Sequence, residues 1–208
     1  MSNYLKAGKG LKNMFIATVG AIICQVLLVI PFPFVNSIAM VATMVFTILN
    51  LMGLWTVGED IAECKKAFWF TILGWVVNSI ANAANNLSAT GTSVIGTLFS
   101  IGGSALSLAV TYYVCISAAS ALRSFGAEEA AASGDRAWKI ALWTTIASIV
   151  ASVLCLIPIL NIIGALLAVI ATIAALVGMV FYMIFLNKAY KAFGGIRAGR
   201  LSYVLRDT

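Results

Sequence analysis

The sequence predicts an all-α polytopic membrane protein whose six transmembrane helices form three tandem hairpins in parallel orientation, with both termini cytoplasmic. Of its 208 residues, 62% are hydrophobic and 10% are charged, and the mean hydropathy is +1.04. Such a chain has too few polar side chains to cover a soluble globule. The apolar residues fall in six long runs, and charged and uncharged connections alternate between these runs. These features indicate that the lipid bilayer is the solvent of this chain.

Six apolar runs are long enough to cross roughly 30 Å of hydrocarbon, which takes about 20 residues of helix. The first run is too long for the core of a signal peptide and lacks a small-residue cleavage site, so we expect it to be retained. The six runs are residues 11–32, 36–57, 67–87, 93–122, 138–159 and 161–186.

The distribution of charge predicts the orientation. All 13 Lys and Arg residues lie in the N-terminal segment, in the connections after the second and fourth runs, or in the C-terminal tail, and the seven acidic residues lie in the same segments. The other three connections, "PFPFVNS", "NNLSATGTS" and "PILN", are uncharged. By the positive-inside rule, the charged connections and both termini are cytoplasmic. The stretch 126–135 in the fourth connection is read as a loop too short to be a domain.

An internal repeat predicts the hairpins. "PFVNSI" at 33–38 is followed 125 residues later by "PILNII", and "KAF" at 66–68 recurs at that same offset. A middle copy ends in "RSFG" at 123–126. We therefore divide one transmembrane domain, 1–208, into hairpin repeats 11–66, 67–126 and 136–193, with a basic tail at 194–208. Because each repeat starts and ends on the charged side, the copies are related by an axis along the membrane normal.

Asparagines on the third run form a ladder. Asn78, Asn82 and Asn85 fall within one sector of about 60° of a helix. The fourth run carries a facing stripe of hydroxyls, and antiparallel folding sets Asn78 level with residues 100–104, Asn82 level with Thr97, and Asn85 level with Ser93. We therefore expect a hydroxyl partner at each level. The stripe members singled out are Ser93, Thr97, Ser100, Ser104 and Ser107.

Two interpretations of this ladder remain open. In the first, small residues bring the helices close together and amides hydrogen-bond across the interface, which makes the protein a membrane-embedded structural or interaction subunit. In the second, the polar side chains line a path for a neutral solute, which makes the protein a small channel or facilitator. A small-residue face on the sixth run, including Gly164, Ala171 and Gly178, is expected to serve helix packing.

The sequence gives no sign of catalysis. Without histidine there is no imidazole base for a serine or cysteine nucleophile, and no carboxylate or base lies deep within a run, where proton relays would need one. Glu59, Asp60 and Glu63 are read as a solvated helix end, and the four cysteines lack metal-ligand spacing. We expect no enzymatic activity, no catalytic, metal-binding or cofactor-binding residues, and no cofactor.

The net charge of +6 lies at the predicted cytoplasmic face and favours contact with anionic lipid headgroups. No soluble basic domain with interleaved aromatic residues is present, so nucleic acid is not an expected partner. The expected partners are membrane lipids together with either a second copy of the chain or another subunit. The expected location is the plasma (inner) membrane of a prokaryote.

Overall fold

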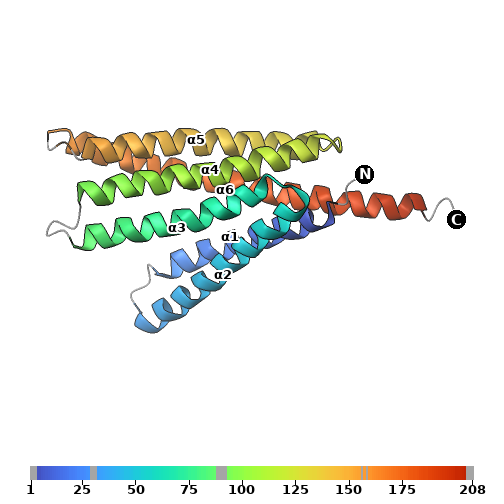
Figure 1. Cartoon of the computed structure of the whole chain (residues 1–208), viewed down its shortest axis with the longest axis horizontal. Coiled ribbons are helices and arrows are strands. Elements are labelled where there is room, and N and C mark those ends of the chain that lie inside the picture. Colours follow the sequence, from blue (N-terminus) through green and yellow to red (C-terminus); the bar gives the residue numbers. More distant parts are fainter. Residues whose placement is uncertain (1–3, 29–31, 88–92, 156, 158, 205–208) are drawn as a thin grey trace. The chain divides into compact units, whose positions relative to one another are not determined.

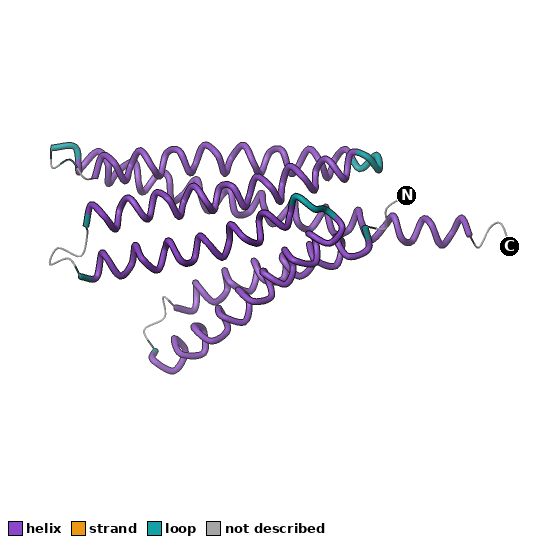
Figure 2. The backbone as a smooth tube through the Cα atoms, viewed as in Figure 1, coloured by secondary structure: helices purple, strands orange, loops and turns teal. Residues whose placement is uncertain are grey.

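The computed structural model describes residues 4–28, 32–87, 93–155, 157 and 159–204. These residues form six α-helices and no strand (Figures 1 and 2). All six helices are long and apolar enough to cross a membrane, which confirms the predicted all-α class with six helices of membrane-spanning length. Their bounds are α1 Leu5–Leu28, α2 Pro33–Asp60, α3 Cys64–Asn86, α4 Val94–Arg123, α5 Glu128–Cys155 and α6 Asn161–Val204.

Local sequence explains where several helices begin and end. Pro33 starts α2, since proline lacks the N–H that the first helical turn leaves unpaired. Ser93 caps α4, with its Oγ accepting a hydrogen bond of 2.8 Å from the N–H of Gly96. Gly126 ends the turn after α4 at φ 75°, and Ala127 N–H donates to the carbonyl of Leu122 at 3.0 Å. This left-handed glycine with a bond back into the last turn terminates α4.

α5 and α6 extend furthest beyond their predicted spans, by ten and 18 residues, whereas the other helices exceed theirs by at most six residues at either end. The stretch 126–135, expected as a loop, is helical from Glu128 onward, so that expectation was wrong for most of its length. Its alanines favour helix, and Glu128 and Glu129 lie in the first turn, where negative charge is favourable. α6 continues past residue 186 to Val204. Its 44 residues amount to about 66 Å of helix, twice the thickness of a bilayer core.

The chain divides into two compact units, and α4, α5 and α6 contribute to both. Unit 1 comprises Met1–Lys65, Ser117–Ser133 and Met183–Thr208. α1 and α2 lie side by side within it (Figure 1). A Cβ added at Gly10 would lie 2.6 Å from the carbonyl oxygen of Gly53, so these backbones are in direct contact. Core residues of unit 1 that are at most 1% exposed include Leu11, Met14, Leu54, Val57, Leu122, Phe185 and Leu186.

Aromatic side chains from three segments of unit 1 pack against one another. The ring of Tyr4 lies 5.0 Å from that of Phe125 and 5.9 Å from that of Phe193, between ring centroids. Phe125 and Phe193 are 6.3 Å apart. Lys188 of α6 forms an ion pair of 2.6 Å with Glu129 of α5. These contacts join four parts of unit 1: the N-terminal segment, the turn that follows α4, the start of α5, and α6. All of them lie in or beside the charged segments of the sequence.

Unit 2 comprises Lys66–Ile116 and Gly134–Tyr182. Its most buried residues are mostly small, such as Ala81, Ala151 and Ala171 at 1–2% exposure. Large apolar side chains face outward instead, with Trp143 70% and Ile162 76% exposed. Small residues inside and large apolar residues outside are the arrangement that helix packing in lipid favours.

Candidate functional site

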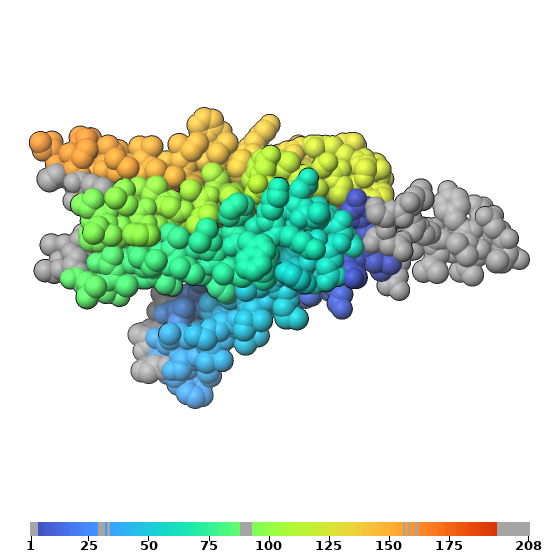
Figure 3. Space-filling model, in the orientation of Figure 1, coloured from blue at the N-terminus to red at the C-terminus, as the bar shows by residue number. Residues whose placement is uncertain are grey.

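The polar residues that the sequence singles out lie on α3 and on the first part of α4, both within unit 2. Side chains of the two helices meet along the pair (Figure 3). Ser93 is the capping residue of α4, and the remaining hydroxyl residues follow along that helix. The structure thus places the ladder and the stripe on neighbouring helices, and three contacts establish their register.

The first contact joins Asn85 to the start of α4. The backbone N–H of Ser93 donates to Asn85 Oδ1 at 3.0 Å, and the Ser93 hydroxyl donates to the same oxygen at 3.4 Å. A Cβ added at Gly96 would overlap this oxygen. Asn85 therefore satisfies an unpaired donor at the helix N-terminus, and Gly96 leaves room for its amide.

The second contact lies two turns deeper, where the amide of Asn78 packs against Gly103. A Cβ at Gly103 would overlap Asn78 Oδ1 and would lie 3.1 Å from its Nδ2. Gly103 falls inside the stretch 100–104 that antiparallel folding sets level with Asn78. The amide thus fills the space that a side chain at residue 103 would occupy.

The third contact is aromatic and lies toward the start of α3. Phe70 and Tyr113 stack with their ring centroids 5.7 Å apart, and Lys66 Nζ lies 5.6 Å from the centroid of the Tyr113 ring. A step back along α3 is therefore matched by a step forward along α4, as in an antiparallel helix pair.

The hydroxyls of α4 do not follow the expected pairing. Thr97 Oγ1 donates to the carbonyl of Ser93 and Ser104 Oγ donates to that of Ser100, both at 2.9 Å. Thr111 Oγ1 donates to the carbonyl of Ser107 at 3.1 Å. Within the described part of α3 and α4, no hydrogen bond joins Asn78 or Asn82 to one of these hydroxyls. Serine and threonine in helices commonly bond the carbonyl one turn earlier, so a hydroxyl partner forms only at Asn85.

The ladder lies along the edge of the helix contact. Asn85, Ser93, Thr97, Ser100 and Ser104 are half-buried, whereas Asn78, Asn82 and Ser107 are exposed. Asn78 therefore touches Gly103 and is also open on its other side. Asn82, one turn further along α3, faces outward.

Gly96 and Gly103 also belong to this site, although the sequence analysis singled out only the asparagines and hydroxyls of the two helices. Their spacing in the sequence could have identified them. The two glycines are seven residues apart, as are Asn78 and Asn85, and two helices that pack along a shared seam repeat every seven residues. Matching intervals of glycine and asparagine in an antiparallel pair indicate that each amide fits over a glycine.

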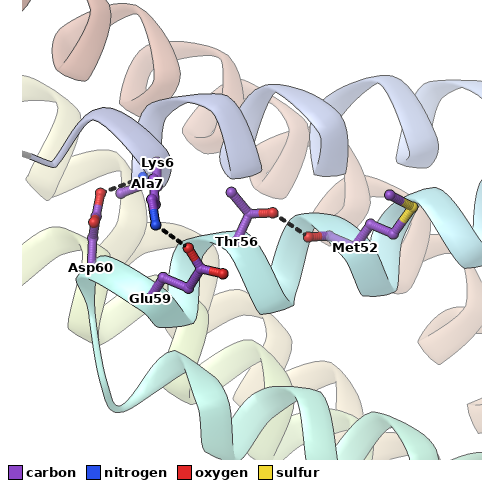
Figure 4. Close-up of polar contacts among 6 residues, drawn as sticks. All are labelled: Lys6, Ala7, Met52, Thr56, Glu59 and Asp60. Atoms are coloured by element: carbon purple, nitrogen blue, oxygen red, sulfur yellow. Dashed lines mark hydrogen bonds and ion pairs between the residues drawn. The ribbon is translucent and has the colours of Figure 1, made fainter.

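The acidic cluster at the end of α2 holds that helix to α1 (Figure 4). Glu59 forms an ion pair of 2.6 Å with Lys6, and Asp60 Oδ2 accepts a hydrogen bond of 2.8 Å from the backbone N–H of Ala7. Negative charge near the start of α1 is favourable to that helix. Among the described residues, no three His, Cys, Asp or Glu side chains are grouped closely enough to hold a metal ion.

The described contacts of α3 and α4 thus join amides, glycines and backbone donors, which is an arrangement suited to holding helices together.

Comparison of the chain with protein-family models, with curated proteins and with solved structures finds no match.

Proposed function

We propose that the protein is a non-enzymatic, membrane-embedded structural or interaction subunit, built from three helical hairpins with both termini in the cytoplasm. The observation that carries this proposal is the fit of the Asn78 and Asn85 amides over Gly103 and Gly96. These amides fill the space between α3 and α4 and so contribute to packing. A solute path along this seam would need that space to be open to water.

The hydroxyl bonds of α4 support the same function. Thr97 and Ser104 donate to carbonyls of their own helix. The single O–H donor of each hydroxyl is therefore already used in a hydrogen bond. A solute path between α3 and α4 would require these donors to face the passing molecule. Interhelical polar contacts in membranes contribute about 0.6 kcal/mol each on average, which is enough to fix a register when several act together.

Burial at equivalent positions supports the three-hairpin repeat. Ala39 of α2 has its counterpart in Gly96 of α4 and in Gly164 of α6 when the repeats are aligned on "KAF", "RSF" and "KAF". All three residues are buried. Gly53 and its counterpart Gly178 each face the preceding helix, Gly53 against Met14 of α1 and Gly178 against Ile140 of α5. Those contacts lie at matching heights of the first and third hairpins, as a tandem repeat requires.

The start of the second helix in each hairpin provides a further correspondence. Asn36, Ser93 and Asn161 occupy equivalent positions, and both Asn and Ser are favoured as helix caps. Ser93 caps α4, and Asn161 is the first residue of α6. α2 instead begins earlier at Pro33, and Asn36 Oδ1 is buried without a hydrogen-bond partner among the described residues.

The alternative function is a small channel or facilitator for a neutral solute. The exposure of Asn78 and Asn82 favours it, because two outward amides at the edge of the α3–α4 contact could line a path formed with other helices. In either function, basic residues at the charged face would contact anionic headgroups, and the expected location is the plasma membrane of a prokaryote.

Flux measurements on purified protein separate the two functions. Proteoliposomes carrying the wild-type chain are expected to pass glycerol and urea no faster than empty vesicles. A flux that disappears in the Asn78→Leu/Ser104→Leu variant, while the control Thr172→Leu retains it, would overturn the structural function. Thr172 provides a matched control because its exposed hydroxyl, on α6, also donates to its own helix. A partner recovered in fixed stoichiometry after mild extraction is the result expected of an interaction subunit.

A further inference from the structure

One side of α3 carries polar side chains that the α3–α4 contact leaves wholly or partly exposed. Asn78 and Asn82 are exposed and lie one turn apart, so both project from the same side of the helix. Trp75, Ser79 and Asn86 are exposed on the adjoining part of that side. Apolar residues dominate the opposite side, including Leu73, Val76 and Ile80.

The depth of these amides makes their exposure costly. Counted from Ala67, where the apolar run begins, Asn78 lies about 16 Å along the helix and Asn82 about 22 Å. Both depths fall inside a hydrocarbon layer of roughly 30 Å. Lipid chains offer no hydrogen bonds, so an amide left unpaired in an apolar environment carries a large desolvation cost. A further polar surface at the same two depths would remove this cost.

We propose that a second copy of this chain supplies that surface, through a parallel, two-fold symmetric contact between the α3 helices at Asn78 and Asn82. This inference rests on the proposed function as an interaction subunit, and it names the partner. Copies inserted in the same orientation are related by an axis along the membrane normal, so each residue meets its own counterpart at the same depth. The symmetry brings identical amides together at both levels.

The chemistry of the amide suits this symmetry. An asparagine side chain carries both a donor NH₂ and an acceptor oxygen, so two identical amides can each donate to the other. A lysine or a carboxylate at these positions would instead face an identical residue with the same charge, and the two would repel each other. A different partner would need polar residues at both depths with the same spacing, whereas a second copy has them by identity. Asn85 is already occupied by Ser93, which leaves Asn78 and Asn82 as the two contact levels.

Association of the full-length protein in lipid bilayers tests the contact. Energy transfer between labelled copies, measured as the protein is diluted with lipid, is expected to show dimers. Asn78→Leu/Asn82→Leu is expected to raise the dissociation constant about tenfold or more, as the loss of two reciprocal contacts implies. Asn86→Leu is the matched control: it makes the same change at the outer end of α3, where water can satisfy an amide, and should dimerise as the wild type does.

Disulfide trapping gives a second readout that keeps both amides in place. Cys24, Cys64 and Cys115 are buried, so replacing the exposed Cys155 by alanine gives a background suited to engineered thiols. In this Cys155→Ala background, Asn86→Cys on the amide side is expected to form cross-linked dimers, and Ile80→Cys on the opposite side is not. Far-UV circular dichroism of each variant checks that its helices remain folded.

A wild-type protein that stays monomeric at every lipid dilution would overturn the proposal, as would a folded Asn78→Leu/Asn82→Leu variant that dimerises as tightly as the wild type. These failures are distinguishable from failure of the proposed function. A monomer without flux that co-purifies with a different subunit would refute the dimer and leave the structural function standing. Flux through the wild-type protein would refute the structural function whatever its oligomeric state.

Discussion

At the scale of single residues, glycine determines how closely the helices of this protein approach one another. Gly96 and Gly103 each face an asparagine amide. Gly102, next to Gly103, differs from it: a Cβ there would make an ordinary contact of 3.7 Å with Val77 Cγ1. Two adjacent glycines on one helix thus have different roles, and only Gly103 is required by the side chain opposite.

A pair of alanine substitutions tests this difference. Gly103→Ala is expected to lower the free energy of unfolding by about 1 kcal/mol, because the Asn78 amide must rotate away from α4 to make room. Gly102→Ala should leave stability unchanged or raise it, since alanine favours helix over glycine. Both are measured by reversible unfolding of the protein in detergent micelles.

A double substitution identifies the cause. In an Asn78→Ala background the overlap is gone, so the effect of Gly103→Ala should largely disappear, which a double-mutant cycle would show as a coupling energy. Equal losses in the presence and absence of the Asn78 amide would contradict the contact.

The sequence allows part of this site to be predicted. The helical periodicity of Asn78, Asn82 and Asn85 and their register against α4 follow from spacing alone. The bonding of Thr97 and Ser104 does not, because a hydroxyl in a helix can bond either the facing helix or its own carbonyl one turn back. The choice between these two hydrogen bonds depends on the distance between the helices. That distance is determined here by Gly96 and Gly103.

At the scale of whole helices, apolar length predicted the six spans but not the true ends of α5 and α6. Hydropathy reports where a helix is surrounded by lipid. It does not report where the helix stops, because residues outside the bilayer can extend it by their own helix propensity. The alanine-rich residues after Glu128 do so for α5. Capping signals such as Ser93 and Gly126 are the better guide to helix ends.

The pair α1–α2 depends on direct backbone contact. At Gly10, an added Cβ would lie 2.6 Å from the carbonyl oxygen of Gly53 and 2.8 Å from the backbone N of Val57. Neither atom can move without moving α2. Gly10→Ala should therefore lower the free energy of unfolding by about 2 kcal/mol, within the range that overpacking causes, and by more than Gly103→Ala does.

Gly74→Ala is the control for this substitution, because a Cβ there would lie 3.8 Å from the nearest atom, Leu106 Cβ. It should be neutral or slightly stabilising in the same unfolding measurement. A Gly10→Ala protein as stable as Gly74→Ala would show that α1 and α2 are further apart than the structure has them.

At the scale of the whole molecule, the ends of the helices differ in chemistry. One set of connections carries the charged residues and the other set carries none. In unit 1, ion pairs and a hydrogen bond join segments at the charged ends: Glu59 with Lys6, Asp60 with Ala7, and Glu129 with Lys188. The sequence could predict the charge asymmetry but not these pairings, because they join residues far apart along the chain. Exposed pairs of this kind add little stability individually, and the apolar core beside them supplies the greater part.

The charge asymmetry predicts which residues are accessible from outside the cell. Leu87, just after α3, is 88% exposed and lies at an uncharged connection, whereas Ser124, just after α4, is exposed at a charged one. In a Cys155→Ala background, a membrane-impermeant maleimide should label Leu87→Cys on intact cells and should label Ser124→Cys only after permeabilisation. The physical reason is that Lys and Arg near the ends of spans are retained on the cytoplasmic side. Labelling of Ser124→Cys alone on intact cells would invert the orientation, and labelling of both residues on intact cells would contradict a crossing of the membrane by α4, which lies between them.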